Sequence, residues 1–102
     1  MAVFYIREND TSPAILYALT PTTVSLAGAS VQFRMRSIWK DTFDITGAAV
    51  VVTETGTPTV RYDWIASDTA TPGFYVAEFV VTYADTTIET FPNYNPLFVV
   101  VN

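Results

Sequence analysis

The chain has 102 residues, of which half are hydrophobic and only 15% are charged, and its formal net charge at pH 7 is −5. This length fits a single domain, and an acidic chain lacks the basic stripe that nucleic acids require. The absence of both His and Cys removes the usual nucleophile–base pairs, the common zinc sites and any disulfide. We therefore expect one non-enzymatic domain, residues 1–102, without a cofactor, a metal or a nucleic-acid partner.

The scarcity of charge indicates a partly apolar surface. A domain of this size leaves roughly a third of its chain surface exposed after folding, and the mean hydropathy of this chain is +0.29. The longest unbroken apolar run, Leu97 to Val101, is much shorter than the about twenty residues needed to cross a bilayer. We therefore expect a protein that is made in the cytoplasm, has no membrane partner and normally lies against other proteins.

Period-two patterns run through the chain, and no window shows helical periodicity. The clearest alternation places Val31, Phe33 and Met35 on one face and polar residues on the other, as in a half-buried strand. Turn signals recur every eight to twelve residues, which is typical of a β-sandwich or barrel. The predicted strands cover residues 3–7, 14–19, 30–37, 48–53, 60–64, 75–83, 88–91 and 97–101. The predicted fold is all-β, an immunoglobulin-like antiparallel β-sandwich of about eight strands.

The corner before residue 75 supports this fold. Its pattern Asp-x-Ala-x-x-Gly-x-Tyr-x-Ala, from Asp68 to Ala77, is similar to the corner before strand F of immunoglobulin-like sandwiches. In that corner a Tyr packs inward and its hydroxyl bonds back to the turn, and Tyr75 would take this role. Asp68 can also bond to the backbone of its own turn. An ordinary turn followed by a core tyrosine remains the alternative.

Acidic residues suggest little chemistry beyond solvation. A glycosidase-like acid pair would need two converging carboxylates. The available candidates sit on strand faces and turns, where solvated carboxylates are expected anyway: Asp63, Asp68, Glu78 and Glu89. The loops that contain Asp41 with Asp44, and Glu8 with Asp10, are rich in oxygen but lack the spacing of a calcium loop. We therefore predict no catalytic, cofactor or metal site.

Aromatic residues fall into two groups. Those at inward strand positions are predicted to form the core: Phe33, Trp64, Tyr75, Phe79 and Tyr83. By contrast, Trp39, Phe43 and Tyr94 lie in loops, where aromatic side chains either anchor a partner or cover the end of the sandwich. The sequence leaves both interpretations open.

The two terminal segments are apolar on both faces. Residues 3–6 and Leu97 to Val101 would each either add to a neighbour's sheet or form a central strand of the sandwich itself. Together with the loop aromatics they define a candidate partner interface, which comprises Val3, Phe4, Tyr5, Trp39, Phe43, Tyr94, Leu97 and Phe98.

Several blocks together resemble the N-terminal domain of phage baseplate upper proteins. The blocks are IRENDTSP at 6–13, LAGASVQFRMR at 26–36, VRYDW at 60–64, GFYVAEF at 73–79 and TFP at 90–92. The resemblance implies a virion structural protein, present in multiple copies and bound to tail, baseplate, fibre or capsid subunits. In that family the domain attaches a longer protein to the tail or baseplate.

Because the chain stops at Asn102, we expect a small tail or neck component, a fibre adaptor or a capsid decoration protein. A carbohydrate-binding module is the rival from another class. It would use an exposed aromatic beside acids or amides, either Trp39 with Asp41 or Tyr94 with Asn93 and Asn95.

Overall fold

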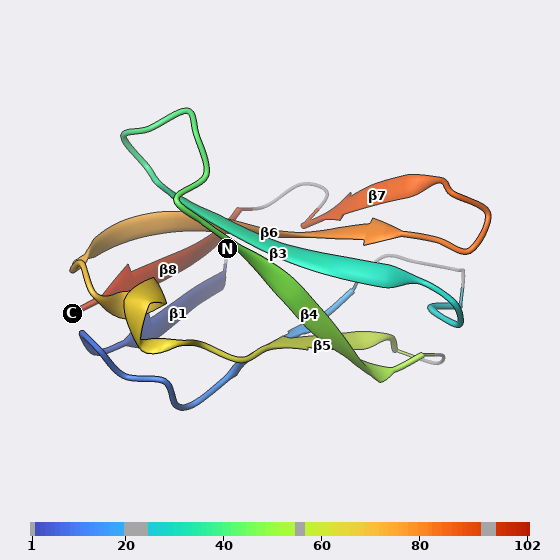
Figure 1. Cartoon of the computed structure of the whole chain (residues 1–102), viewed down its shortest axis with the longest axis horizontal. Coiled ribbons are helices and arrows are strands. Elements are labelled where there is room, and N and C mark those ends of the chain that lie inside the picture. Colours follow the sequence, from blue (N-terminus) through green and yellow to red (C-terminus); the bar gives the residue numbers. More distant parts are fainter. Residues whose placement is uncertain (1, 20–24, 55–56, 93–95) are drawn as a thin grey trace.

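The chain is all-β in a computed structural model that describes residues 2–19, 25–54, 57–92 and 96–102 (Figure 1). The strands are β1 (Ala2–Ile6), β2 (Ile15–Ala18), β3 (Ser30–Ser37), β4 (Ile45–Thr53), β5 (Thr59–Tyr62), β6 (Gly73–Thr82), β7 (Ile88–Phe91) and β8 (Leu97–Val101). A short 3-10 helix, η1 (Ala66–Thr69), lies between β5 and β6. No helix in these described ranges is long and apolar enough to span a membrane.

The strands form two packed layers that share β4. One layer has the order β1-β8-β6-β3-β4, with β7 paired to the far end of β6. In β4, the residues up to Ala49 pair with β3, whereas Val50 to Thr53 pair with β5, which pairs in turn with β2. Pairing of β2 with β5 and of β3 with β6 is the strand arrangement of an immunoglobulin-like sandwich. The predicted all-β sandwich is therefore confirmed.

One pair departs from the predicted antiparallel arrangement. β1 runs parallel to β8, with Val3 opposite Phe98 and Tyr5 opposite Val100. Antiparallel neighbours usually follow from a short hairpin connection. β1 and β8 are the first and last strands, so the whole domain separates them and no hairpin sets their relative direction. The expectation of a wholly antiparallel sheet was wrong at this edge.

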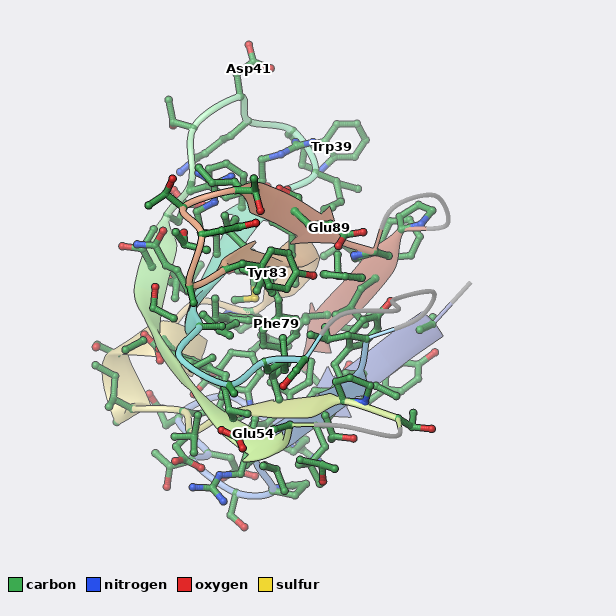
Figure 2. The ribbon with its side chains drawn as sticks, turned by 90° about the vertical axis from the view of Figure 1, so that its right-hand side faces the viewer. Trp39, Asp41, Glu54, Phe79, Tyr83 and Glu89 are labelled. Atoms are coloured by element: carbon green, nitrogen blue, oxygen red, sulfur yellow. The ribbon has the colours of Figure 1, made fainter. Side chains whose placement is uncertain are left out.

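The core is an aromatic cluster centred on Phe33. Its ring centroid lies 4.3 Å from that of Tyr62 in a stacked pair, 5.1 Å from Phe79 and 5.5 Å from Trp64. Such pairs contribute about 0.5–1.5 kcal/mol each beyond the burial of their area. Figure 2 shows Phe79 between the two layers. The predicted inward positions are confirmed, except that Tyr83 is only half-buried and donates a hydrogen bond to Glu89 at 2.7 Å.

β4 begins earlier than predicted and includes Gly47. The sequence placed Gly47 in a loop and began the strand at Ala48, but β4 begins at Ile45. A Cβ atom on Gly47 would lie only 2.7 Å from Cε1 of the Tyr62 ring. Position 47 therefore needs a residue without a side chain, because Tyr62 packs against its backbone. The glycine is not needed there to form a turn.

The predicted corner is present before β6. The Tyr75 hydroxyl donates to the carbonyl oxygen of Thr71 at 2.6 Å, and the Tyr75 side chain is buried. Asp68 completes the turn, since its Oδ2 accepts from the backbone N–H of Ile65 at 3.0 Å and from the Tyr62 hydroxyl at 2.6 Å. The corner thus connects η1, β5 and β6 through Asp68 and Tyr75, which the sequence pattern identified, and through Tyr62, which it did not include.

We expect Tyr75→Phe to lower the free energy of unfolding by about 1 kcal/mol, because it removes one hydrogen bond and keeps the buried ring. Tyr5→Phe is the control, since the Tyr5 side chain is 65% exposed. That variant should change the free energy by less than about 0.5 kcal/mol. Urea denaturation of both variants measures the difference. Equal stabilities would show that the corner bond contributes nothing.

Candidate partner-binding surface

The outer face of β1, β8 and the first half of β6 exposes apolar side chains. β6 and β8 alternate between buried and outward positions, and the register aligns the outward residues with those of β1. One row across the sheet is Tyr5, Val100 and Phe74, and the next is Val3, Phe98 and Val76. We call these two rows the outer apolar face.

The outer apolar face is accessible and carries no charge. Tyr5 is 65% exposed, Phe74 60% and Val3 38%. Rings of this kind bury about 150–250 Å² each when covered, so the exposed parts of Tyr5 and Phe74 alone present roughly 200–300 Å². The complete face reaches the range of about 300–600 Å² in which the largest apolar patch of a monomer is often functional. Charged side chains border it: Arg36 of β3 lies opposite Val76, and Glu78, the next outward residue of β6, pairs with Arg34 of β3.

β1 adds an unpaired backbone edge to this face. The Asn102 N–H donates to the carbonyl oxygen of Ile6 at 2.8 Å, and the Glu8 N–H donates to the carbonyl oxygen of Asn102 at 2.8 Å. Backbone groups alternate between the two sides of a strand, so those of Val3 and Tyr5 point away from β8. No other described strand pairs with β1. An edge with free N–H and C=O groups is a template for a further strand.

β2 is another edge strand, but its surroundings differ. Leu16 is 60% exposed on the outer face of the second layer. It lies opposite Arg61, which pairs with Asp63 at 3.0 Å. An apolar partner placed there would have to desolvate this ion pair, which is unfavourable. The β1 edge is therefore the better docking site of the two.

Only some of the predicted interface residues lie on the outer apolar face. It brings Val3, Tyr5 and Phe98 together on the outer apolar face. Phe4 points inward instead and stacks on Trp64, with ring centroids 5.8 Å apart. Tyr94 lies outside the described residues.

Leu97 was wrongly included, because it is only 3% exposed and belongs to the core. The interpretation of Leu97 to Val101 as a strand that adds to a neighbour's sheet was also wrong. β8 is already paired on both sides, with β1 and with β6. Its two-faced apolar pattern instead reflects a central strand.

The two loop aromatics have different roles. Trp39 is 86% exposed, whereas Phe43 is half-buried beneath Arg34, whose guanidinium carbon lies 4.4 Å from the ring centroid. Phe43 therefore supports a charged side chain at the border of the face and is not a free anchor. Residues 38–44 are held by Lys40 Nζ, which is 3.1 Å from Asp44 Oδ1, and this hydrogen bond keeps the pKa of Asp44 below its usual value.

Sequence reasoning missed Phe74, Val76 and Val100. The signal was present, since the alternation that places Tyr75 and Ala77 inward places Phe74 and Val76 outward. The sequence prediction considered only the inward-facing residues of that pattern. Recognising Val100 needed the register, because it becomes part of the face through its pairing with Phe74 and Tyr5.

The carboxylates considered as an acid pair bind separate partners. Asp63 pairs with Arg61, Glu78 with Arg34, Asp68 with Tyr62, and Glu89 with Tyr83. Among the residues that the structure describes, no group of three or more His, Cys, Asp or Glu side chains is placed to hold a metal ion.

Comparisons of the chain with protein families, with curated proteins and with solved structures found no match. Function is therefore inferred from the residues and their geometry, and the resemblance to phage baseplate upper proteins stays a prediction.

Tyr62 makes stability depend on alkaline pH. Burial raises the pKa of its hydroxyl well above the usual value of about 10, and the hydrogen bond to Asp68 raises it further. The folded chain thus keeps a proton that the unfolded chain releases, so we expect the free energy of unfolding to fall as pH rises above about 10. Tyr62→Phe should be less stable at neutral pH and show a shallower alkaline decline.

Urea denaturation at a series of pH values measures this decline. Some slope will remain in the variant, because burial also raises the pKa values of Tyr17 and Tyr75. An unchanged slope in Tyr62→Phe would contradict the assignment.

Proposed function

We propose that this chain is a non-enzymatic docking module of a bacteriophage virion, attached to tail, baseplate or fibre subunits through the outer apolar face and the β1 edge. The observation that supports it is the uncharged outer apolar face, which lies beside an unpaired strand edge. The phage context comes from the sequence resemblance, which implies attachment to the tail or baseplate.

Docking at this site would use backbone and side chains together. An extended segment of the partner would bond to the backbone of Val3 and Tyr5 and continue the sheet beyond β1. Part of the partner would also cover the rings of Tyr5 and Phe74. Burial of the exposed part of the Phe74 ring would contribute about 1–2 kcal/mol. Tyr and Phe are enriched in the cores of protein interfaces, in keeping with this arrangement.

A small contact per copy is sufficient for attachment when many copies bind one particle. A virion presents many equivalent sites, and linking several weak contacts raises the total affinity by orders of magnitude. A capsid decoration protein would use the same face in the same way. The location at which the chain binds the particle therefore distinguishes a tail docking module from a capsid decoration protein.

The test is cosedimentation with particles of the phage that encodes the chain, prepared without it. Wild-type chain should bind in a fixed ratio, and isolated tails and heads should identify the location. Tyr5→Asp places a charge in the outer apolar face and should weaken binding by at least about tenfold, as expected for a central interface residue.

Leu16→Asp is the matched control, because Leu16 is 60% exposed and also lies on an edge strand. It should bind as wild type does. Equal binding by Tyr5→Asp, or equal losses in the two variants, would contradict docking at β1. No binding of the wild-type chain to any part of the particle would overturn the virion role.

A further inference from the structure

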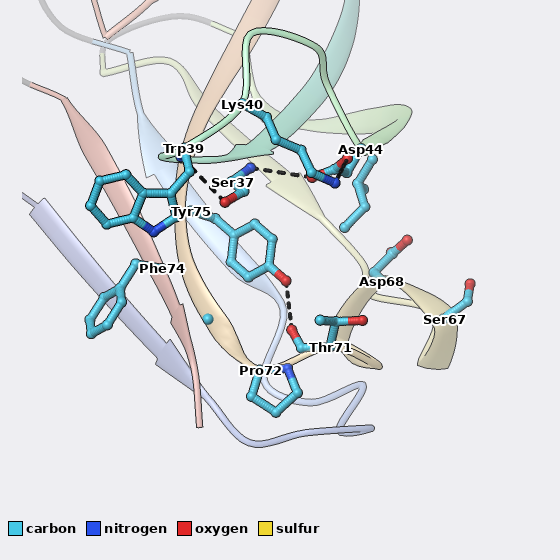
Figure 3. Close-up of a pocket in the computed structure, with 12 residues that line it drawn as sticks. Ser37, Trp39, Lys40, Asp44, Ser67, Asp68, Thr71, Pro72, Phe74 and Tyr75 are labelled. Atoms are coloured by element: carbon cyan, nitrogen blue, oxygen red, sulfur yellow. Dashed lines mark hydrogen bonds and ion pairs between the residues drawn. The ribbon is translucent and has the colours of Figure 1, made fainter.

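A pocket of about 520 Å³ opens at one end of the sandwich (Figure 3). It lies between the loop of residues 38–44 and the corner that contains Ser67 and Thr71. Pockets of about 300–1,000 Å³ with aromatic walls and a few polar groups are typical of small-molecule sites. The docking role described above does not use this pocket, although Phe74 borders both surfaces.

One side of the pocket is aromatic and exposed. Trp39 and Phe74 both line it, with 86% and 60% of their surfaces exposed, and Figure 3 shows them on the same side. Trp39 makes no ring contact with another described residue, so its indole face is open to a ligand. An open aromatic face beside polar groups suits a ligand that has both C–H and hydroxyl surfaces.

Donors and acceptors line the same pocket, across Tyr75 from these two rings (Figure 3). Lys40 Nζ lies 3.1 Å from Asp44 Oδ1, and Asp44 Oδ2 accepts from the Ser37 N–H at 3.3 Å. An ammonium group has three donors and a carboxylate has about four acceptor sites, so both keep free capacity. A donor and an acceptor held this close together match neighbouring hydroxyl groups, each of which can donate and accept.

Local hydrogen bonds hold the pocket loop in place before any ligand binds. The Asp44 N–H donates to the Met35 carbonyl at 3.0 Å, and the Lys40 N–H donates to the Ser37 carbonyl at 3.0 Å. The Ile38 N–H donates to the Phe74 carbonyl at 3.2 Å and connects the loop to β6. A preordered loop loses less conformational entropy on binding.

The charge in the pocket disfavours anions. Two carboxylates, Asp44 and Asp68, line it with a single cation, Lys40, and the whole chain has a net charge of −5. Asp44 is ionised at neutral pH, since its hydrogen bond with Lys40 lowers its pKa. A negatively charged ligand would be repelled here, whereas a neutral polyol would not.

We propose that this pocket binds a neutral saccharide of more than one sugar unit, with one pyranose ring against the indole of Trp39 and hydroxyl groups farther along the saccharide bonded to Lys40 and Asp44. The carbohydrate-binding alternative considered from the sequence paired Trp39 with Asp41, whereas the residue that lines this pocket with Trp39 is Asp44. Figure 2 shows Asp41 at the tip of the loop, apart from Trp39.

Nuclear magnetic resonance of the full chain tests this site directly. The chain has two Trp residues, and Trp64 is only 4% exposed, so its indole N–H signal serves as an internal reference. The probes are linear neutral hexasaccharides of glucose, mannose, galactose and N-acetylglucosamine, up to about 10 mM, which detects even millimolar binding. At least one should shift the Trp39 indole signal to saturation and leave that of Trp64 nearly unchanged.

Variants separate this site from the docking face. Trp39→Ala should weaken saccharide binding by more than about tenfold, and Asp44→Asn by several-fold, whereas Tyr5→Asp should bind as wild type does. A sialylated form of the bound saccharide should bind at least about tenfold more weakly than the neutral form. The proposal would be overturned by a lack of saturable binding to every neutral probe, by wild-type binding in Trp39→Ala, or by equal binding of the sialylated form.

Discussion

The stacking of Tyr62 on Phe33 is the contact on which the rest of the sandwich depends. Phe33 comes from β3 in one layer and Tyr62 from β5 in the other, and their ring centroids are 4.3 Å apart. The Tyr62 ring also requires the bare backbone of Gly47, where β4 passes from one layer toward the other. Its hydroxyl binds Asp68, which places η1 and the corner before β6. One side chain thus connects the core, the bend of β4 and the turn that begins β6.

The outer apolar face follows from that core, because the side chains of β6 and β8 alternate between inward and outward positions. Once Tyr75 and Ala77 face inward, Phe74 and Val76 must face outward, and pairing with β8 and β1 extends the apolar rows. The inward-facing side chains of β6 and β8 stabilise the fold, and the outward-facing side chains leave apolar surface that water hydrates poorly. The corner also fixes one wall of the pocket, since Thr71 binds the Tyr75 hydroxyl and faces the loop that contains Trp39. Docking face and pocket therefore share β6 but use different chemistry.

Local patterns in the sequence predicted local structure well. Period-two spacing identified the inward residues of β3, β5 and β6, and the pattern from Asp68 to Ala77 identified the Tyr75 corner. The predictions that failed concerned residues whose surroundings are set by contacts with residues distant in the chain. Gly47 resembled a loop residue because the Tyr62 ring that excludes a side chain is remote in sequence. Leu97 resembled an edge residue because a two-faced apolar strand has the same pattern at an edge and in the centre. Phe43 resembled an anchor until its contact with Arg34 was known.

Hydrogen exchange at β1 tests the central claim most directly, namely that the outer apolar face and the β1 edge hold this chain to its partner. The backbone amides of Val3 and Tyr5 point away from β8, so they should exchange rapidly in the free chain. In the chain bound to its particle we expect both amides to become protected, while those of β2 stay unchanged. Unprotected amides at Val3 and Tyr5 in the bound chain, with protection at Ile15–Ala18 instead, would contradict the account.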